Sequence, residues 1–266
     1  MLPWRLITNR DIGLLFYINF ATGAAMYAVL YFVNLFFTLV KGFTADKAGV
    51  QLLYYTPGLA VGVYFSMFMC NVWPRKTFWP IMLGSIVEAF GIGFLAYGLW
   101  TEKTSTIYGM MALTGAGTAM RMMPGPLHAV GFFPQHIATV VALMAVAIPF
   151  GGTLALTIMA TVFNNTSGIG PSSPLRDFQN IVTLPHDEQV YWIHQAKMGL
   201  VWSFVAIVPF MILCVLAAAC LGNVIITKDK AGEDGYGEKV QEEAYLLSLL
   251  RGTNQQSART TMEAKA

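Results

Sequence analysis

The last long apolar stretch decides the fold class: residues 198–226 read MGLVWSFVAIVPFMILCVLAAACLGNVII, without one charged side chain. A helix needs about 20 mainly apolar residues to cross the hydrocarbon core of a membrane. Two more charge-free gaps of this kind separate Asp11 from Lys41 and Lys47 from Arg75. Such long, uniformly apolar runs favour helices over the alternating strands of a membrane barrel. We therefore expect an all-α integral membrane protein.

The composition agrees with this expectation. Of the 266 residues, 56% are hydrophobic and only 11% are charged, whereas a soluble domain carries about 25% charged residues. The net charge of +2 gives no reason to expect nucleic acid as a partner. Cys70, Cys214 and Cys220 lie in apolar surroundings and are interpreted as small packing residues rather than as a disulfide framework or metal site.

Working outward from the quoted stretch, the hydropathy pattern predicts a bundle of six membrane-spanning helices at residues 12–226. The six spans are expected at about 12–40, 48–70, 79–100, 104–123, 137–164 and 198–226. Residues 1–11 form an N-terminal segment, residues 165–197 form the one long loop, and residues 227–266 form a polar tail that we expect to be partly disordered.

An even number of spans places both termini on the same side of the membrane. Lysine and arginine are slightly more frequent on that side, which favours cytoplasmic termini and an extracytoplasmic 165–197 loop. Two overlapping glycosylation sequons, at Asn164 and Asn165, open this loop. The sequence thus predicts a multi-pass protein of the plasma membrane, with Asn164 and Asn165 as candidate glycosylation sites.

Glu88 is the one carboxylate well inside a predicted span. A charged side chain at the bilayer centre costs about 2.5–3.5 kcal/mol on insertion scales, and such residues commonly have a function. Glu88 is therefore the candidate proton-coupling residue. Gly84 and Gly91 lie on the same helical face, so another helix or a substrate can approach closely. The alternative is a protonated carboxyl group that holds two helices together by a hydrogen bond.

Arg121 is the candidate cation of the fourth span, with Thr114 and Thr118 on the same face at helical spacing. It can hold an anionic group or pair with a carboxylate. It can also extend to the membrane interface, because it lies about one turn from the helix end. We favour the interface from the sequence alone.

Two groups of polar and aromatic residues are candidate lining for a substrate cavity. They are Tyr27, Tyr31 and Asn34 in the first span, at positions i, i+4 and i+7, and Gln51 and Tyr55 in the second, at i and i+4. Aromatic rings with polar edges suit amphipathic organic molecules. Tyrosines near span ends are also common as interfacial anchors, which is the alternative.

Small residues at a spacing of four predict close helix packing. Ala147, Gly151 and Ala155 show this pattern in the fifth span, and Gly58 and Gly62 show it in the second. The histidines have no paired metal-ligand spacing, and there is no nucleophile motif, phosphate loop or zinc signature. We therefore expect no enzyme activity, no metal site and no cofactor.

Several segments carry a resemblance to a known family. They are PWRLITNR (3–10), YFVNLFF (31–37), VKGFTADKAGV (40–50), GAG (115–117), MPG (123–125) and IPFGG (148–152). Over roughly residues 3–226, the chain resembles the C-terminal six-helix half of a major facilitator superfamily transporter. It is most similar to the fungal fourteen-span drug:proton antiporters. Only Arg75 and Lys76 match the last two positions of the family's loop motif.

The resemblance implies a transporter, or half of one, that exports small amphipathic organic molecules such as toxins, drugs or secondary metabolites by proton antiport. Its expected partners are the lipid bilayer, the substrate, protons and a second six-helix unit. Family members have two such halves. The second unit would be another copy of this chain or a missing N-terminal half. The alternative function is a non-transporting membrane scaffold or partner subunit.

Overall fold

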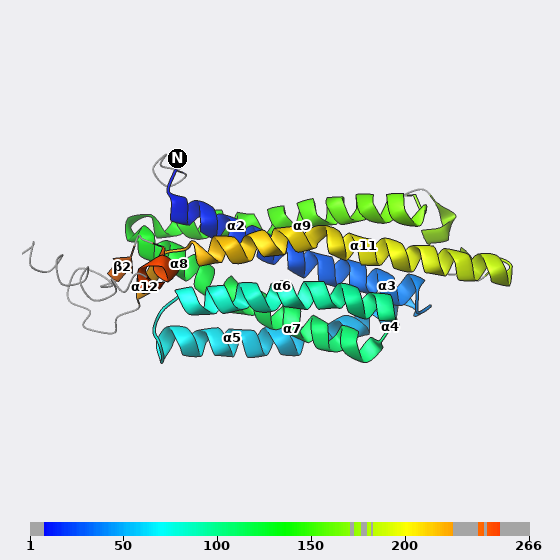
Figure 1. Cartoon of the computed structure of the whole chain (residues 1–266), viewed down its shortest axis with the longest axis horizontal. Helices are drawn as coiled ribbons and strands as arrows, with labels where there is room; N and C mark the ends of the chain where they lie inside the picture. The colour runs from blue at the N-terminus through cyan, green and yellow to red at the C-terminus, as the bar shows by residue number, and fades with distance from the viewer. Residues whose placement is uncertain are drawn as a thin grey trace, which may run out of the picture.

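Long helices lie side by side in the computed structural model of this protein (Figure 1). The structure describes residues 8–170, 173–176, 180–181, 183–225, 239–241 and 244–250. The expected all-α membrane class is confirmed in these residues, where one pair of three-residue strands is the exception. Parts of the predicted N-terminal segment and most of the polar tail, including its expected disorder, lie outside them.

The first span combines α2 (Arg10–Ala28), a π-helical turn η1 (Val29–Val33) and α3 (Asn34–Leu39). Asn9 starts the helix, because its side-chain oxygen accepts hydrogen bonds from the backbone N–H groups of Asp11 at 3.0 Å and Ile12 at 3.3 Å. The π-helical turn holds more residues than an α-helical turn, so it rotates the residues after it relative to those before it.

The next three spans form one side of the bundle. They are α4 (Ala45–Gln51) continued by η2 (Leu52–Tyr54) and α5 (Tyr55–Asn71), then α6 (Phe78–Thr101), then α7 (Thr104–Met122). Helix α7 packs against both α5 and α6. These contacts are far more extensive than the direct contact between α5 and α6, so α7 is the main link among the three spans.

The remaining elements form the other side of the bundle and the end of the described chain. They are α8 (Pro124–Phe132), η3 (Pro134–His136), α9 (Ile137–Ser167), η4 (Pro174–Arg176), α11 (His186–Ala219), β1 (Asn223–Ile225), β2 (Lys239–Gln241) and α12 (Tyr245–Leu250). Helix α9 packs on α2, and α11 packs on α6, α9 and α2. Fully buried aromatic residues fill the space between these helices, including Phe32 of η1 against Phe204 of α11.

Helix α11 differs from the expected range of 198–226. It begins at His186, inside the segment expected to be a loop, and ends at Ala219. Pro185 and the acidic residues Asp187 and Glu188 favour a helix start at this point, because acidic groups interact favourably with the N-terminal end of the helix dipole. Polar residues before a span can therefore continue its helix.

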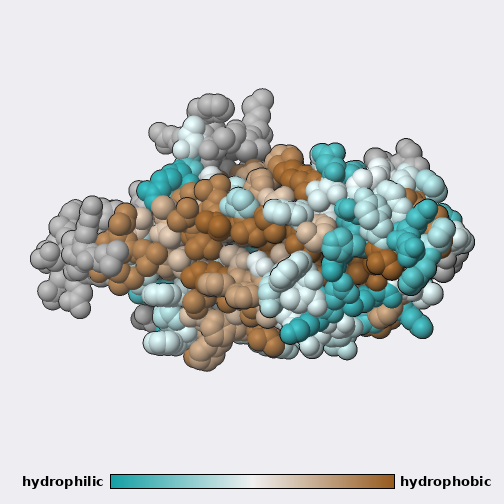
Figure 2. Space-filling view, turned by 45° about the vertical axis from the view of Figure 1, so that its right-hand side comes forward, coloured by the Kyte–Doolittle hydropathy of each residue, from teal (hydrophilic) through white to brown (hydrophobic). Residues whose placement is uncertain are grey.

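Five of the described helical segments are long and apolar enough to cross a membrane, where the sequence predicted six spans. Helix α7 forms at the expected place but is not one of the five. The residues Thr114, Thr118 and Arg121, together with several glycines, lower the hydropathy of this helix, and these three side chains are buried inside the bundle. In Figure 2, hydrophobic residues cross the middle of the visible face and hydrophilic residues gather toward one end, as in a membrane bundle.

The C-terminal segments pack against the end of the bundle where α6 begins. Strand β1 pairs with β2 in antiparallel register. Lys76 Nζ donates a hydrogen bond to Tyr245 Oη at 2.7 Å, and the Tyr245 ring lies 5.0 Å from the ring of Phe78. Part of the predicted polar tail is therefore attached to the membrane domain.

Candidate functional site

An ion pair joins α6 and α7 inside the bundle. Glu88 is 0% exposed and Arg121 is 1% exposed, and Glu88 Oε2 contacts Arg121 Nη2. Of the alternatives drawn from the sequence, the structure has Arg121 paired with a carboxylate. The favoured interfacial position is wrong, because α6 and α11 cover the guanidinium despite its place near the end of α7.

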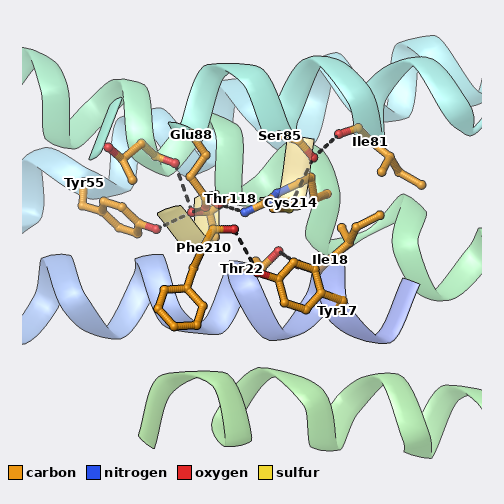
Figure 3. A network of polar contacts seen from close by, with 12 residues as sticks. Tyr17, Ile18, Thr22, Tyr55, Ile81, Ser85, Glu88, Thr118, Phe210 and Cys214 are labelled. Atoms are coloured by element: carbon orange, nitrogen blue, oxygen red, sulfur yellow. Dashed lines mark hydrogen bonds and ion pairs between the residues drawn. The ribbon is translucent and has the colours of Figure 1, made fainter. Parts of the chain in front are cut away.

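The other carboxylate oxygen of Glu88 begins a chain of contacts with two hydroxyl groups. Thr118 Oγ1 donates to Glu88 Oε1 at 2.5 Å. Tyr55 Oη and Thr118 Oγ1 lie 2.7 Å apart, within hydrogen-bond distance. Tyr55 comes from α5 and Thr118 from α7, so three helices contribute to one continuous set of polar contacts (Figure 3). All of these residues are buried.

A fourth helix contacts the cation of the pair. Arg121 Nη1 donates to Cys214 Sγ on α11 at 2.7 Å. Cys214 in turn lies 3.8 Å from Ser85 Oγ on α6, and Ser85 donates to the backbone oxygen of Ile81 at 2.8 Å. Arg121 is therefore held between a carboxylate and a sulfur atom, with α6 and α11 on either side.

Glycines allow the two charged side chains to meet. A Cβ atom added at Gly117 of α7 would lie 2.6 Å from the backbone nitrogen of Glu88. One added at Gly84 of α6 would lie 2.8 Å from Cγ of Arg121, and one at Gly91 would collide with Thr114. The backbones of α6 and α7 approach closely at the pair because these positions lack side chains.

The other predicted packing residues also lie at helix contacts. Gly58 and Gly62 of α5 face the backbone oxygens of Ala112 and Ala116 on α7, and Gly151 of α9 faces that of Phe20 on α2. Ala147 and Ala155 are buried on the same helix as Gly151.

The structure separates the cavity candidates of the first span. The Tyr27 ring packs over Gly152 of α9. Tyr31 lies in the π-helical turn, is 52% exposed, and lines a shallow apolar pocket with Phe32, Leu35, Leu39, Ala160 and Phe163. Asn34 Oδ1 is buried without a hydrogen-bond partner. The stripe expected from α-helical spacing is therefore broken, because the π turn lies within it.

The candidates of the second span join the polar contacts of α7 instead. Gln51 Oε1 accepts a hydrogen bond from Tyr108, whose ring stacks on that of Tyr54 with centroids 3.9 Å apart. Tyr55 reaches Thr118. The five cavity candidates thus form two groups, one in the first span, where Tyr27 and Tyr31 face α9, and the other in the second span, where Gln51 of α4 and Tyr55 of α5 contact α7.

A second cluster of charges lies outside the spans, where α6 ends. Glu102 bonds Lys197 Nζ at 2.8 Å and Lys41 Nζ at 3.2 Å. The hydrogen bond from Lys197, with further support from Lys41, lowers the pKa of Glu102 from its ordinary value although partial burial opposes the shift. The sequon residues Asn164 and Asn165 occupy the last turn of α9. Within the described residues, no group of three His, Cys, Asp or Glu side chains is arranged to hold a metal ion.

Sequence reasoning missed the parts of the site that come from distant elements. Cys214 was interpreted as a packing residue and Tyr108 was not considered. No local signal marks either residue, because Cys214 meets Arg121 only when α11 packs beside α7, and Tyr108 meets Gln51 only when α4 packs beside α7. Thr118 had the clearer signal, since it lies one turn before Arg121 on the same face.

Comparison with known proteins finds relatives that are all fungal membrane transporters. Efflux pump DEP3 of Fusarium langsethiae is 32% identical over 153 residues, which are 56% of this chain and 27% of the pump. MFS-type transporter sphD of Aspergillus fumigatus is 27% identical over 68% of this chain and 33% of its own length. MFS-type efflux pump elcC of Phaeosphaeria nodorum is 27% identical over 62% of this chain and 29% of its own length. No protein-family model matches the chain.

The match covers about a quarter to a third of each of these relatives. The bundle of apolar helices agrees with such a partial length. The recognition from sequence is confirmed: the chain is a multi-pass membrane relative of the fungal efflux transporters of the major facilitator superfamily, with a length and fold consistent with one half of such a protein.

Proposed function

We propose that this chain is half of a membrane exporter that moves small amphipathic organic molecules, such as toxins, drugs or secondary metabolites, in exchange for protons. The observation that carries the proposal is the Glu88–Arg121 ion pair, buried between α6 and α7. Ionisable residues inside membrane bundles commonly belong to proton relays and substrate pathways. The relatives' names, as efflux pumps and transporters, favour export and a role other than enzyme catalysis.

Proton binding at Glu88 changes the energetics of this pair. A neutral Glu88 no longer balances the charge of Arg121, and a guanidinium group does not lose its own proton in proteins. An unpaired buried charge is strongly unfavourable. Protonation therefore favours a second arrangement of α6, α7 and α11 in which Arg121 finds another partner or reaches water. A proton gradient can drive a conformational cycle through this coupling.

The substrate class follows from the two groups of cavity candidates. Tyr31 offers an aromatic ring at an apolar pocket, Tyr27 packs its ring on Gly152 of α9, and Asn34 has a buried amide oxygen without a hydrogen-bond partner. Gln51 and Tyr55 offer polar groups beside α7. Rings with polar edges suit molecules that are partly apolar and partly polar.

A second six-helix unit completes the carrier in this proposal. Two of the five apolar spans are buried least. In residues 45–71, 22% of the most apolar stretch is buried, and in residues 134–167 the buried share is 28%. We infer that a further copy of this chain or an N-terminal half covers part of these helices. We place the protein in the plasma membrane with cytoplasmic termini, which would expose Asn165 to glycosylation outside the cell.

The test is dye transport in membrane vesicles from yeast cells that express the chain. We expect a pH gradient to drive movement of the fluorescent amphipathic dye ethidium, and Glu88→Gln to abolish that movement without reducing the amount of inserted protein. Glu102→Gln is the matched control, because Glu102 also pairs with cations but lies outside the spans. It should transport normally.

Two results would overturn the proposal. Dye movement equal to that of vesicles without the chain would remove transport by copies of this chain alone and favour the scaffold alternative or a separate N-terminal half. Normal transport by Glu88→Gln would remove proton coupling at Glu88. Chemical cross-linking in the same membranes tests the second unit, because a monomer without any cross-linked partner would exclude it.

A further inference from the structure

We propose that the hydroxyl groups of Tyr55 and Thr118 form a relay that carries the proton to Glu88, a role that rests on the proposed function of Glu88. The relay crosses three helices within two hydrogen bonds, from α5 through α7 to α6. Figure 3 shows Tyr55, Thr118 and Glu88 in one continuous line of dashed contacts.

The donors and acceptors in the relay determine which hydroxyl group donates to which. Each hydroxyl group has one hydrogen to donate and can also accept. Thr118 Oγ1 donates to Glu88 Oε1 at 2.5 Å, so its lone pairs are free to accept from Tyr55 Oη at 2.7 Å. Tyr55 is then the donor and Glu88 the final acceptor.

Proton transfer along this line balances without any other reactant. An incoming proton binds a lone pair of Tyr55 Oη, the original Tyr55 hydrogen moves to Thr118 Oγ1, and the original Thr118 hydrogen moves to Glu88 Oε1. One proton enters and one is bound at Glu88, while both hydroxyl groups stay neutral. Thr118 can then rotate back, because the backbone oxygen of Thr114 lies 3.0 Å from Oγ1 as an alternative acceptor.

The two carboxylate oxygens of Glu88 have separate partners. Oε1 accepts from Thr118, whereas Oε2 contacts Arg121. The relay therefore delivers the proton to the oxygen that Arg121 does not occupy. Delivery does not require the ion pair to open first, and the pair is weakened only when the carboxyl group has become neutral.

Among the groups around Glu88, Tyr55 is the one from which the relay starts. Among the described residues, the titratable and charged side chains around the pair are Tyr55 from α5, Arg121 from α7, Cys214 from α11 and, through its interaction with Cys214, Tyr17 from α2. Arg121 is a permanent cation, and Tyr17 donates to the backbone oxygen of Phe210 at 3.1 Å instead. His128 of α8 bonds Thr77 at the start of α6, away from Glu88.

Tyr55 is also the member of the relay nearest to exposed positions. Glu88 and Thr118 are fully buried, whereas the chain neighbours of Tyr55, which are Tyr54 and Thr56, are exposed. Gln51, four residues earlier at the end of α4, bonds Tyr108. In this proposal the proton enters the relay from the α5 side, at the face that the second unit of the proposed function covers.

The test measures protonation of Glu88 without a substrate, in the full chain in lipid vesicles. A rapid acidification should produce the infrared C=O band of a carboxylic acid, and this band should be absent in Glu88→Gln. Tyr55→Phe and Thr118→Val should each slow its appearance by about tenfold or more, as expected when a positioned proton-transfer group is lost. The final amplitude of the band should be unchanged.

Matched controls separate the relay from a loss of packing. Tyr17→Phe and Thr22→Val remove hydroxyl groups that donate to backbone oxygens in the same region, and both should keep the original rate. An unchanged rate in Tyr55→Phe and Thr118→Val would overturn the relay while leaving Glu88 as the proton site. Absence of the Glu88 band in the unaltered protein would instead overturn the proposed function itself.

Discussion

In the part of the chain that the structure describes, two glutamates pair with basic residues, in opposite environments. Glu88 and Arg121 meet at the contact of α6 and α7, with at most 1% of either side chain exposed. Glu102 bonds Lys41 and Lys197 where α6 ends, and 39% of the Glu102 side chain is exposed. Both clusters join separate helical segments of the bundle, but only the first is shielded from solvent.

The difference shows why similar charge pairs have different roles. Around Glu102, water screens the charges, so such a pair contributes between 0 and about 1 kcal/mol. Around Glu88, no water compensates a lost partner, so removal of one charge leaves the other at a high cost. Only in the buried pair does the binding of one proton cause a large change in the free energy of the helix arrangement. For this reason we assign proton coupling to Glu88.

The largest expected effect comes from breaking the buried pair on one side. Glu88→Leu leaves Arg121 as an unpaired buried cation and should lower the free energy of unfolding by about 3–5 kcal/mol. The double variant Glu88→Leu/Arg121→Met should recover most of this loss, since it removes both charges. Unfolding titrations in mixed micelles measure both values. A double variant as unstable as the single one would show that the charges are not the cause.

A smaller effect is expected from separating the helices that carry the pair. At Gly117→Ala, the new methyl group meets the backbone of Glu88, which cannot move as a flexible side chain would. The expected loss in the same titration is about 1–3 kcal/mol. Gly109→Ala on the same helix has nothing within 4 Å of the added atom and should cause no loss. Equal effects of the two substitutions would contradict the close contact of α6 and α7.

The smallest effect is expected at the exposed cluster. Glu102→Gln should cost at most about 1 kcal/mol, and added salt should reduce the difference. Because the folded-state pKa of Glu102 is lowered, its contribution is present above the unfolded pKa and is lost as the pH falls through the lowered folded value. Unfolding titrations at several pH values check this. A loss as large as that of Glu88→Leu would remove the contrast between the two clusters.

The sequence identified one member of the site well and another poorly. Glu88 could be found because a carboxylate is rare in the middle of an apolar span. Arg121 lies near a helix end, where local reasoning favours the interface. Its true position depends on contacts with the preceding helix α6 and with α11, which lies much later in the chain. Tyr31 could not be placed because the π-helical turn after α2 has no signature in hydropathy.

By itself, the sequence determined the class of protein and the approximate place of the membrane helices. Long apolar runs allow few other structures, since each backbone hydrogen bond must be satisfied within the membrane. Only the tertiary structure decided that Glu88 pairs with Arg121, that Tyr55 and Thr118 reach its second oxygen, and that Cys214 contacts the cation. These contacts join the successive helices α5, α6 and α7 to α11, which lies much later in the chain. They depend on how closely glycines such as Gly117 let those helices pack, which no local pattern specifies.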